Sequence, residues 1–235
     1  MGTGLAMMAW RCGRVLAGAA LMLLAACGND PGGLDRGALV ANVARGAGLA
    51  LPGQPTPAAA PLARPEQVLA ATQAPVIRAQ TAQGDALYLL GVQDNGPYRS
   101  YATATSQTVT LRGGLITATR GLGRDLMRAD VVQVLDRLTR GSPGPAQRSM
   151  EVLDGEDVTR TLLFDCHIAH GAPGLAPRPA QARRLMQESC RGANDDAAGL
   201  AFTNSYAMGD GGRILMSRQW LPVSSGAMLL EELRP

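Results

Sequence analysis

The stretch TVTLRGGLITAT, from Thr108 to Thr119, decides the fold of this sequence. Val109 and Leu111 alternate with polar residues, which is the period-two pattern of a strand with one buried face. Gly113-Gly114, in the middle of the stretch, supplies the two small residues that a tight hairpin turn requires. The stretch therefore predicts two antiparallel strands joined by this turn.

The same pattern recurs along much of the chain. Further apolar, β-compatible runs flank the turn signals Asn95-Gly96, Asp154-Gly155 and Gly209–Gly212. The expected strands cover residues 75–81, 85–93, 98–105, 107–112, 115–119, 148–153, 158–167, 201–208, 213–221 and 227–233. Successive strands joined by short turns form an antiparallel meander, and a sandwich or an open barrel disposes of its exposed edges. The sequence thus predicts an all-β fold with one or two short helices.

Helical patterns interrupt the strands. Residues Pro65–Ala71 have proline at the first helical position and an acid in the first turn. Asp125–Thr139 has apolar residues at helical spacing, with Asp125 as a candidate cap, and Gln181–Cys190 is a further candidate helix. Gly121–Asp125 lacks the third glycine of a dinucleotide-binding fingerprint, so we interpret it as a tight turn that caps the second helix.

The amino terminus has the features of a bacterial lipoprotein signal. Arg11 and Arg14 precede an apolar run, Val15–Leu24, that is too short to cross a bilayer. The run ends in Leu24-Ala25-Ala26-Cys27, which resembles a lipobox, although an ordinary secretory signal followed by cysteine would look the same. We expect a signal peptide at 1–26, a lipidated Gly/Ala/Pro-rich tether at 27–64 and a single β-rich domain at 65–235.

Lipidation of Cys27 predicts where the protein resides. Each buried CH₂ contributes about 0.8 kcal/mol, so two or three acyl chains such as palmitate hold a protein firmly in a membrane. Gly28 occupies the position at which aspartate would retain a lipoprotein in the inner membrane. We therefore expect an anchor in the outer membrane, on its periplasmic face.

The charge of the mature chain argues against nucleic acid as a partner. All 22 basic residues are arginine, and loss of Arg11 and Arg14 with the signal leaves 20 of them against 19 acidic residues. A nearly neutral chain lacks the basic surface that phosphate backbones require.

The cysteines predict a disulfide. Cys12 leaves with the signal and Cys27 is lipidated, so Cys166 and Cys190 remain as a pair in an oxidising compartment. The sequence Asp165-Cys166-His167, followed by His170, groups residues that could bind metal. Residues of a strand alternate between its faces, and a bridged cysteine offers no thiolate, so we expect neither a metal nor another cofactor.

Catalytic motifs give no support for an enzyme. The adjacent acids Asp195-Asp196 and Glu231-Glu232 would point to opposite faces of a strand, and we expect them to be solvated rather than a glycosidase pair. The sequence contains no Gly-x-Ser-x-Gly elbow for a serine nucleophile. We therefore expect no enzymatic activity and assign no catalytic residue.

Two stretches carry a family resemblance. TLRGGLITATRGLGRDLMRAD (Thr110–Asp130) is similar to the central signature of the YjbF-type lipoproteins, which are associated with exopolysaccharide and group 4 capsule production. SRQWLPVSSGAMLLEEL (Ser217–Leu233) resembles the carboxy-terminal strands of that family, and the resemblance extends roughly over residues 66–233. It implies an all-β outer-membrane lipoprotein that acts in polysaccharide assembly or export beside other envelope proteins, with no catalytic residues to transfer.

Three functions are then open. The first is a non-catalytic accessory of exopolysaccharide or capsule assembly or export, which binds polysaccharide or other export proteins. Trp220 near Arg218 is a candidate ligand contact, because indole could stack on a sugar, although a core tryptophan is the alternative. The second function is a lipocalin-like carrier of an apolar ligand. The third is a hydrolase that modifies the polymer.

Overall fold

The computed structural model describes residues 64–81, 86–122, 125–153, 158–172, 179–222 and 226–235. The expected signal peptide, Cys27, nearly all of the tether and the Asp154-Gly155 turn lie outside these ranges. Within them, no helix combines the length and the apolar character that a membrane crossing needs.

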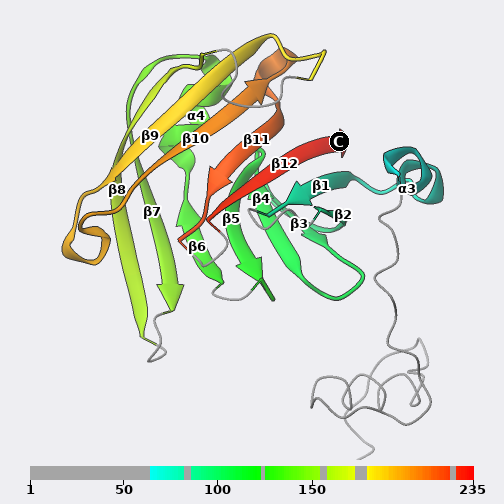
Figure 1. Cartoon of the computed structure of the whole chain (residues 1–235), viewed down its shortest axis with the longest axis horizontal. Helices are drawn as coiled ribbons and strands as arrows, with labels where there is room; N and C mark the ends of the chain where they lie inside the picture. Colours follow the sequence, from blue (N-terminus) through cyan, green and yellow to red (C-terminus); the bar gives the residue numbers. More distant parts are fainter. Residues whose placement is uncertain (1–63, 82–85, 123–124, 154–157, 173–178, 223–225) are drawn as a thin grey trace, which may run out of the picture. The chain divides into compact units, whose positions relative to one another are not determined.

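The described part of the chain contains twelve strands, two α-helices and two short 3-10 helices (Figure 1). In chain order they are α3 (Pro65–Ala71), β1 (Val76–Gln80), β2 (Ala86–Asn95), β3 (Tyr98–Ala102), β4 (Thr108–Arg112), β5 (Leu115–Arg120), β6 (Leu126–Asp130), α4 (Val132–Arg140), β7 (Gly144–Leu153), β8 (Thr159–His170), β9 (Arg184–Gly192), η2 (Asp195–Ala197), β10 (Ala201–Met208), η3 (Asp210–Gly212), β11 (Ile214–Trp220) and β12 (Ala227–Arg234).

All twelve strands belong to one antiparallel meander. Their spatial order is β5-β4-β3-β2-β1-β12-β11-β10-β9-β8-β7-β6, so the first and last strands of the chain pair with each other. The two edges of the sheet are therefore β5 and β6, which follow one another in the sequence. The sheet curls into a nearly closed barrel (Figure 1), which confirms the all-β meander and selects the barrel over the sandwich.

Side chains join the two edge strands where the backbone ladder is interrupted. Thr119 Oγ1 donates to the Asp125 carboxylate at 3.1 Å and accepts from the Leu126 amide at 3.0 Å. The Arg120 guanidinium donates to the Leu126 carbonyl at 3.0 Å. Asp125 also accepts from the Gly121 amide at 2.7 Å, so this carboxylate binds the backbone directly after β5. Strand β6 follows Asp125, where the sequence suggested a capped helix; residues 123 and 124 of the expected turn lie outside the described residues.

The helix predicted over Asp125–Thr139 is wrong in its first part. Leu126–Asp130 forms β6, and α4 begins only at Val132. A β-bulge lies between Leu126 and Arg128 where β6 pairs with β7. The bulge allows Leu126 and Ala129 both to be buried although they are three residues apart, and this spacing imitates a helix.

The candidate helix Gln181–Cys190 is also wrong, because Arg184–Gly192 forms β9. This segment contains Leu, Met, Gln, Glu and Arg, which favour helices intrinsically. In the folded chain β9 pairs with β8 on one side and β10 on the other. Met186, Glu188 and Cys190 are buried at a period of two, so pairing on both sides overrides the local preference.

Helix α3 forms where the sequence predicts it, and the carboxy-terminal strand holds its end. Arg234 of β12 donates to the carbonyl of Leu69 at 2.8 Å and also to that of Thr72. A guanidinium at this end satisfies carbonyls that have no partner within the helix. The segment that follows the expected tether is thereby attached to the sheet.

Candidate functional site

A cavity of about 450 Å³ opens at one end of the sheet. Turns of a meander alternate between its two ends, so the β2–β3, β4–β5 and β10–β11 turns and helix α4, between β6 and β7, share this rim. Residues from all four connections line the cavity. Its volume falls within the roughly 300–1,000 Å³ of ligand sites in proteins. We call it the rim pocket.

Glycines allow these connections to approach each other closely. Gly113 and Gly212 line the rim pocket and have φ of +57° and +77°, which L side chains rarely adopt. A Cβ on Gly113 would lie 2.8 Å from Leu135 of α4, and one on Gly212 would collide with the Thr139 carbonyl. The turn signal Gly113-Gly114 thus also serves to seat α4 against the rim.

Four charged side chains line the rim pocket as two ion pairs. Arg99 Nε and Nη2 lie 2.6 and 3.2 Å from the two carboxylate oxygens of Asp94, its cross-strand neighbour in the β2–β3 hairpin. Arg213 Nη2 lies 2.8 Å from Glu232 Oε1. All four line the pocket, so its charged side chains sum to zero.

The two carboxyl groups differ in their environment. The hydrogen bond from Arg99 lowers the pKa of Asp94. Burial raises the pKa of Glu232, although the neighbouring Arg213 opposes that rise. Both carboxylates are engaged by an arginine, so the arrangement suits hydrogen bonding to a polar ligand.

One tyrosine ring faces the rim pocket. Tyr98 and Tyr101 both line it, but they lie three residues apart on β3, so their side chains point to opposite faces of the strand. Tyr101 is on the face of the buried Val109 and Leu111, and Tyr98 is on the outer face. Burial raises the pKa of Tyr101, which is only 5% exposed, so its hydroxyl stays protonated at neutral pH. The Arg112 guanidinium lies 5.5 Å from the centre of the Tyr98 ring, as its cross-strand neighbour on the outer face. The sequence did not single out Tyr101, because only the pairing of β3 with its neighbours brings its ring to the pocket.

Gln219 links the interior of the sheet to this rim. Its side chain is fully buried, accepts from the Ile116 amide at 2.9 Å and donates to the Gly114 carbonyl at 2.8 Å. Both groups belong to the β4–β5 hairpin, next to a bulge that interrupts its pairing. Gln219 therefore supplies hydrogen bonds from β11 that hold the pocket-lining turn in place.

Trp220 and Arg218, the candidate ligand contacts, do not line the rim pocket. The Trp220 ring stacks on Phe202, with centroids 4.5 Å apart, and meets Phe164 edge-on at 6.0 Å. Trp220 is half-buried in this aromatic cluster, whereas Arg218 is exposed. The Trp220 backbone amide donates to Asn204 Oδ1 at 2.6 Å. The packing favours the core interpretation of Trp220, and a ligand contact at this pair stays a prediction.

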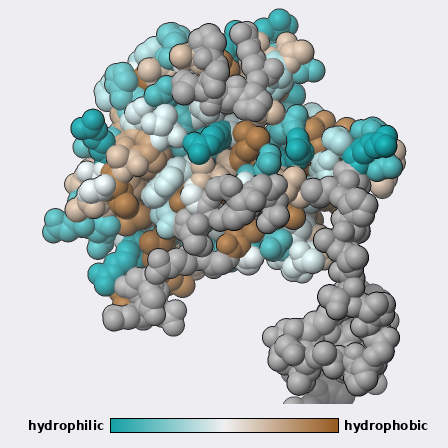
Figure 2. All heavy atoms as spheres, in the orientation of Figure 1, coloured by the Kyte–Doolittle hydropathy of each residue, from teal (hydrophilic) through white to brown (hydrophobic). Residues whose placement is uncertain are grey.

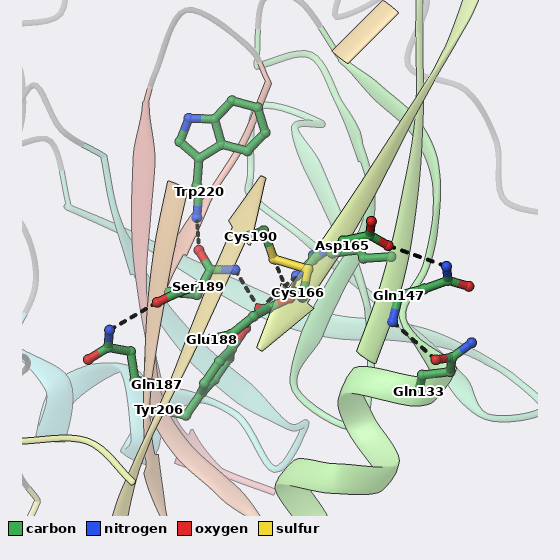
Figure 3. Close-up of a disulfide and its surroundings, with 12 residues drawn as sticks. Gln133, Gln147, Asp165, Cys166, Gln187, Glu188, Ser189, Cys190, Tyr206 and Trp220 are labelled. Carbon is green, nitrogen blue, oxygen red and sulfur yellow. Dashed lines mark hydrogen bonds and ion pairs between the residues drawn. A yellow bond between two sulfur atoms is a disulfide. The ribbon is translucent and has the colours of Figure 1, made fainter. Parts of the chain in front are cut away.

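The expected disulfide is present. Cys166 on β8 and Cys190 on β9 are direct cross-strand partners, with an S–S distance of 2.04 Å (Figure 3). The Glu188 carboxylate lies close to the two sulfurs, so Cys166, Glu188 and Cys190 have the spacing of three metal ligands. In the oxidised protein the sulfurs are bonded to each other, so this group offers no thiolate.

Glu188 instead anchors a buried polar network that the sequence analysis missed. Arg148 Nη1 lies 3.1 Å from Glu188 Oε2, and both side chains are completely inaccessible to solvent. Asn204 Nδ2 and the Tyr206 hydroxyl donate to the same oxygen at 2.7 and 2.5 Å. One signal in the sequence could have revealed this network. Arg148 in β7 and Glu188 in β9 are charged residues at inward-facing positions, between apolar residues on the same face of the strand.

The network changes the ionisation of its members. Burial raises the pKa of Tyr206 well above its ordinary value, and the Glu188 charge raises it further. Burial works against the charged form of Arg148, but the attraction of Glu188 outweighs it and raises the pKa of Arg148. The network therefore keeps a neutral phenol and a cation inside the sheet.

The fold and the site define a class of protein: a nearly closed antiparallel sheet whose pocket at one rim combines an apolar wall with two ion pairs. Residues 55–233 match the family described as "Group 4 capsule polysaccharide lipoprotein gfcB, YjbF". The chain belongs to this family, as the resemblance of its two signature stretches implied.

A solved structure supports the fold. The crystal structure of the hypothetical lipoprotein YmcC from Escherichia coli (K12) superposes with a TM-score of 0.59. The alignment covers 72% of this chain and 88% of that one, at 13% sequence identity. No curated protein matches the sequence.

Proposed function

We propose that this chain is an outer-membrane lipoprotein that acts as a non-catalytic accessory in the assembly or export of an exopolysaccharide or capsule. Membership of a capsule polysaccharide lipoprotein family supports the pathway. The sequence Leu24-Ala25-Ala26-Cys27 supports acylation of Cys27, and Gly28 supports sorting to the periplasmic face of the outer membrane. The Gly/Ala/Pro-rich segment 27–64 would then let the domain stand off from the lipid.

The rim pocket carries the proposal of binding without catalysis. Glycosidic hydrolysis needs one carboxyl group as an acid and a second as base or nucleophile. Asp94 and Glu232 are the carboxyl groups that line this pocket, and each is held by an arginine at hydrogen-bonding distance. An arginine that neutralises a carboxylate favours positioning of a ligand over proton transfer to it.

Other envelope proteins of polysaccharide export are the partners we propose, besides the membrane. On the face visible in Figure 2, hydrophobic patches lie among hydrophilic ones. The exposed large apolar side chains among the described residues are Val92, Val132, Leu153, Val158 and Leu163. Such scattered side chains are compatible with reversible contacts between envelope proteins.

A carrier of an apolar ligand is the second candidate, and one observation favours it. Ile77, Leu111 and Leu230 are buried and line the inner part of the rim pocket. An apolar wall of this kind could accept an acyl chain.

Deletion of the gene tests the first proposal. We expect the amount or the chain length of secreted polysaccharide to change, and the wild-type gene to restore it. A Cys27→Ala allele should fail to restore it and should release the protein from the membrane fraction. Mass spectrometry of the mature amino terminus provides the direct check of acylation. Unchanged polymer in the deletion strain, or an unmodified amino terminus, would contradict the proposal.

A further inference from the structure

We propose that the rim pocket binds an uncharged sugar residue of a polysaccharide, with the Asp94–Arg99 and Glu232–Arg213 pairs as its polar contacts. This inference rests on the proposed function, because it takes the polymer of that pathway as the source of the ligand. It goes further in naming the site and the chemical class of the sugar.

The charge balance of the pocket selects a neutral ligand. An acidic sugar would gain from Arg99 and Arg213 but would meet Asp94 and Glu232 at the same rim. Like charges at short range cost binding energy, so a ligand with a net charge gains little from a charge-balanced site. A hydroxyl group both donates and accepts hydrogen bonds, and it can therefore use a carboxylate and a guanidinium together.

The paired groups keep hydrogen-bonding capacity for such hydroxyls. A guanidinium has five N–H donors, and an ionised carboxylate has about four acceptor positions. Arg213 uses Nη2 on Glu232, and its side chain is 55% exposed; the Asp94 side chain is 62% exposed. In each pair the arginine and the carboxylate hold each other in a fixed orientation, while part of the pair faces solvent. Such preorganisation of the binding groups lowers the free-energy cost of binding a ligand.

The rest of the pocket suits the remaining parts of a sugar ring. A pyranose has apolar C–H faces besides its hydroxyl edge, and Ile77, Leu111 and Leu230 offer an apolar wall for them. Tyr101 adds an aromatic side chain that ends in a hydroxyl group. At Gly96 and Gly211 an added Cβ would meet no atom within 4 Å, so the backbone of both turns is open to a ligand.

Binding of oligosaccharides to the full-length purified lipoprotein in detergent micelles tests the inference. The probes are fragments of the exopolysaccharide of the producing cells, released by partial acid hydrolysis and separated by anion exchange into uncharged and acidic fractions. Palmitate serves as the apolar probe. Isothermal titration calorimetry gives the affinity, and Arg213→Gln and Glu232→Gln are the test variants. Arg128→Gln and Glu151→Gln are matched controls, because this pair joins β6 to β7 at 3.7 Å and does not line the pocket.

We expect the uncharged fraction to bind, and each test variant to weaken it by at least about tenfold while both controls bind as the wild type does. Two binding results would overturn the inference. One is binding of the acidic fraction alone; the other is binding of palmitate that Arg213→Gln weakens as much as we expect for the uncharged oligosaccharides. Equal effects of test and control variants would overturn it as well. If the gene deletion alters the polymer but Arg213→Gln fully restores it, the inference fails and the proposed function stands. If the deletion leaves the polymer unchanged, the proposed function itself fails.

Discussion

Replacement of Glu188 by glutamine should destabilise the protein more than any change of a surface charge. Tyr206, Asn204 and Arg148 all donate to Glu188 Oε2, and an amide oxygen at this place can still accept from them. The NH₂ group takes the place of Oε1, which lies 3.3 Å from Arg148 Nη1, so a donor faces a donor there and the negative charge is lost. The side chains of Arg148 and Glu188 are both fully buried, and among the described residues no hydrogen-bond partner reaches Nε or Nη2 of Arg148. Removal of one member of a buried ion pair costs about 3–5 kcal/mol, because the other charge stays desolvated.

Thermal and urea unfolding measure this cost. For a domain of this size about 1 kcal/mol shifts Tm by about 2–4 °C, so the expected fall is about 6–20 °C. Glu151→Gln is the matched control: it breaks a surface pair with Arg128, for which we expect less than about 1 kcal/mol. The double variant Arg148→Met/Glu188→Gln should recover part of the loss, since it removes the buried cation. Equal shifts for Glu188→Gln and Glu151→Gln, or no recovery in the double variant, would refute the reasoning.

Three further predictions concern stability. Reduction of Cys166–Cys190, or its replacement by two serines, should cost about 3 kcal/mol for a sequence separation of 24 residues, measured by urea unfolding with and without reductant. Gln219→Leu should cost about 2–5 kcal/mol, because the Ile116 N–H and the Gly114 carbonyl lose their side-chain partner, and hydrogen exchange of the Ile116 amide should accelerate. The pKa of Tyr206 is raised in the folded state, so the stability it contributes is present below about pH 10 and is lost as pH rises above that. The free energy of unfolding should therefore fall less steeply between pH 10 and 11 in Tyr206→Phe than in the wild type.

Local patterns were sufficient where an element has one buried face and a clear turn. The hairpin of β4 and β5 around Gly113-Gly114 was predicted in this way, and so was β10. Local patterns failed where pairing with neighbouring strands imposes a strand on residues that favour a helix. In β6 the bulge produced a misleading spacing, and in β9 pairing on both sides outweighed helix propensity.

The disulfide could be predicted from the sequence, whereas the rim pocket could not. Only two cysteines remained to pair, so Cys166 and Cys190 could be predicted by counting. Asp94 and Glu232 are 138 positions apart, and no local pattern relates them. They share a pocket because β1 pairs with β12, which brings the two ends of the domain together.

The amino-acid sequence by itself determined the alternation of buried and polar residues, the tight turns and the pair of cysteines, because each depends on residues close together or on simple counting. Tertiary structure alone decided that the meander closes through its terminal strands, that Arg148 and Glu188 meet inside it, and that charged residues from distant hairpins share one rim. Strand pairing in space is a long-range property: it is selected by the burial of the whole interior, and a short window of sequence does not contain that information.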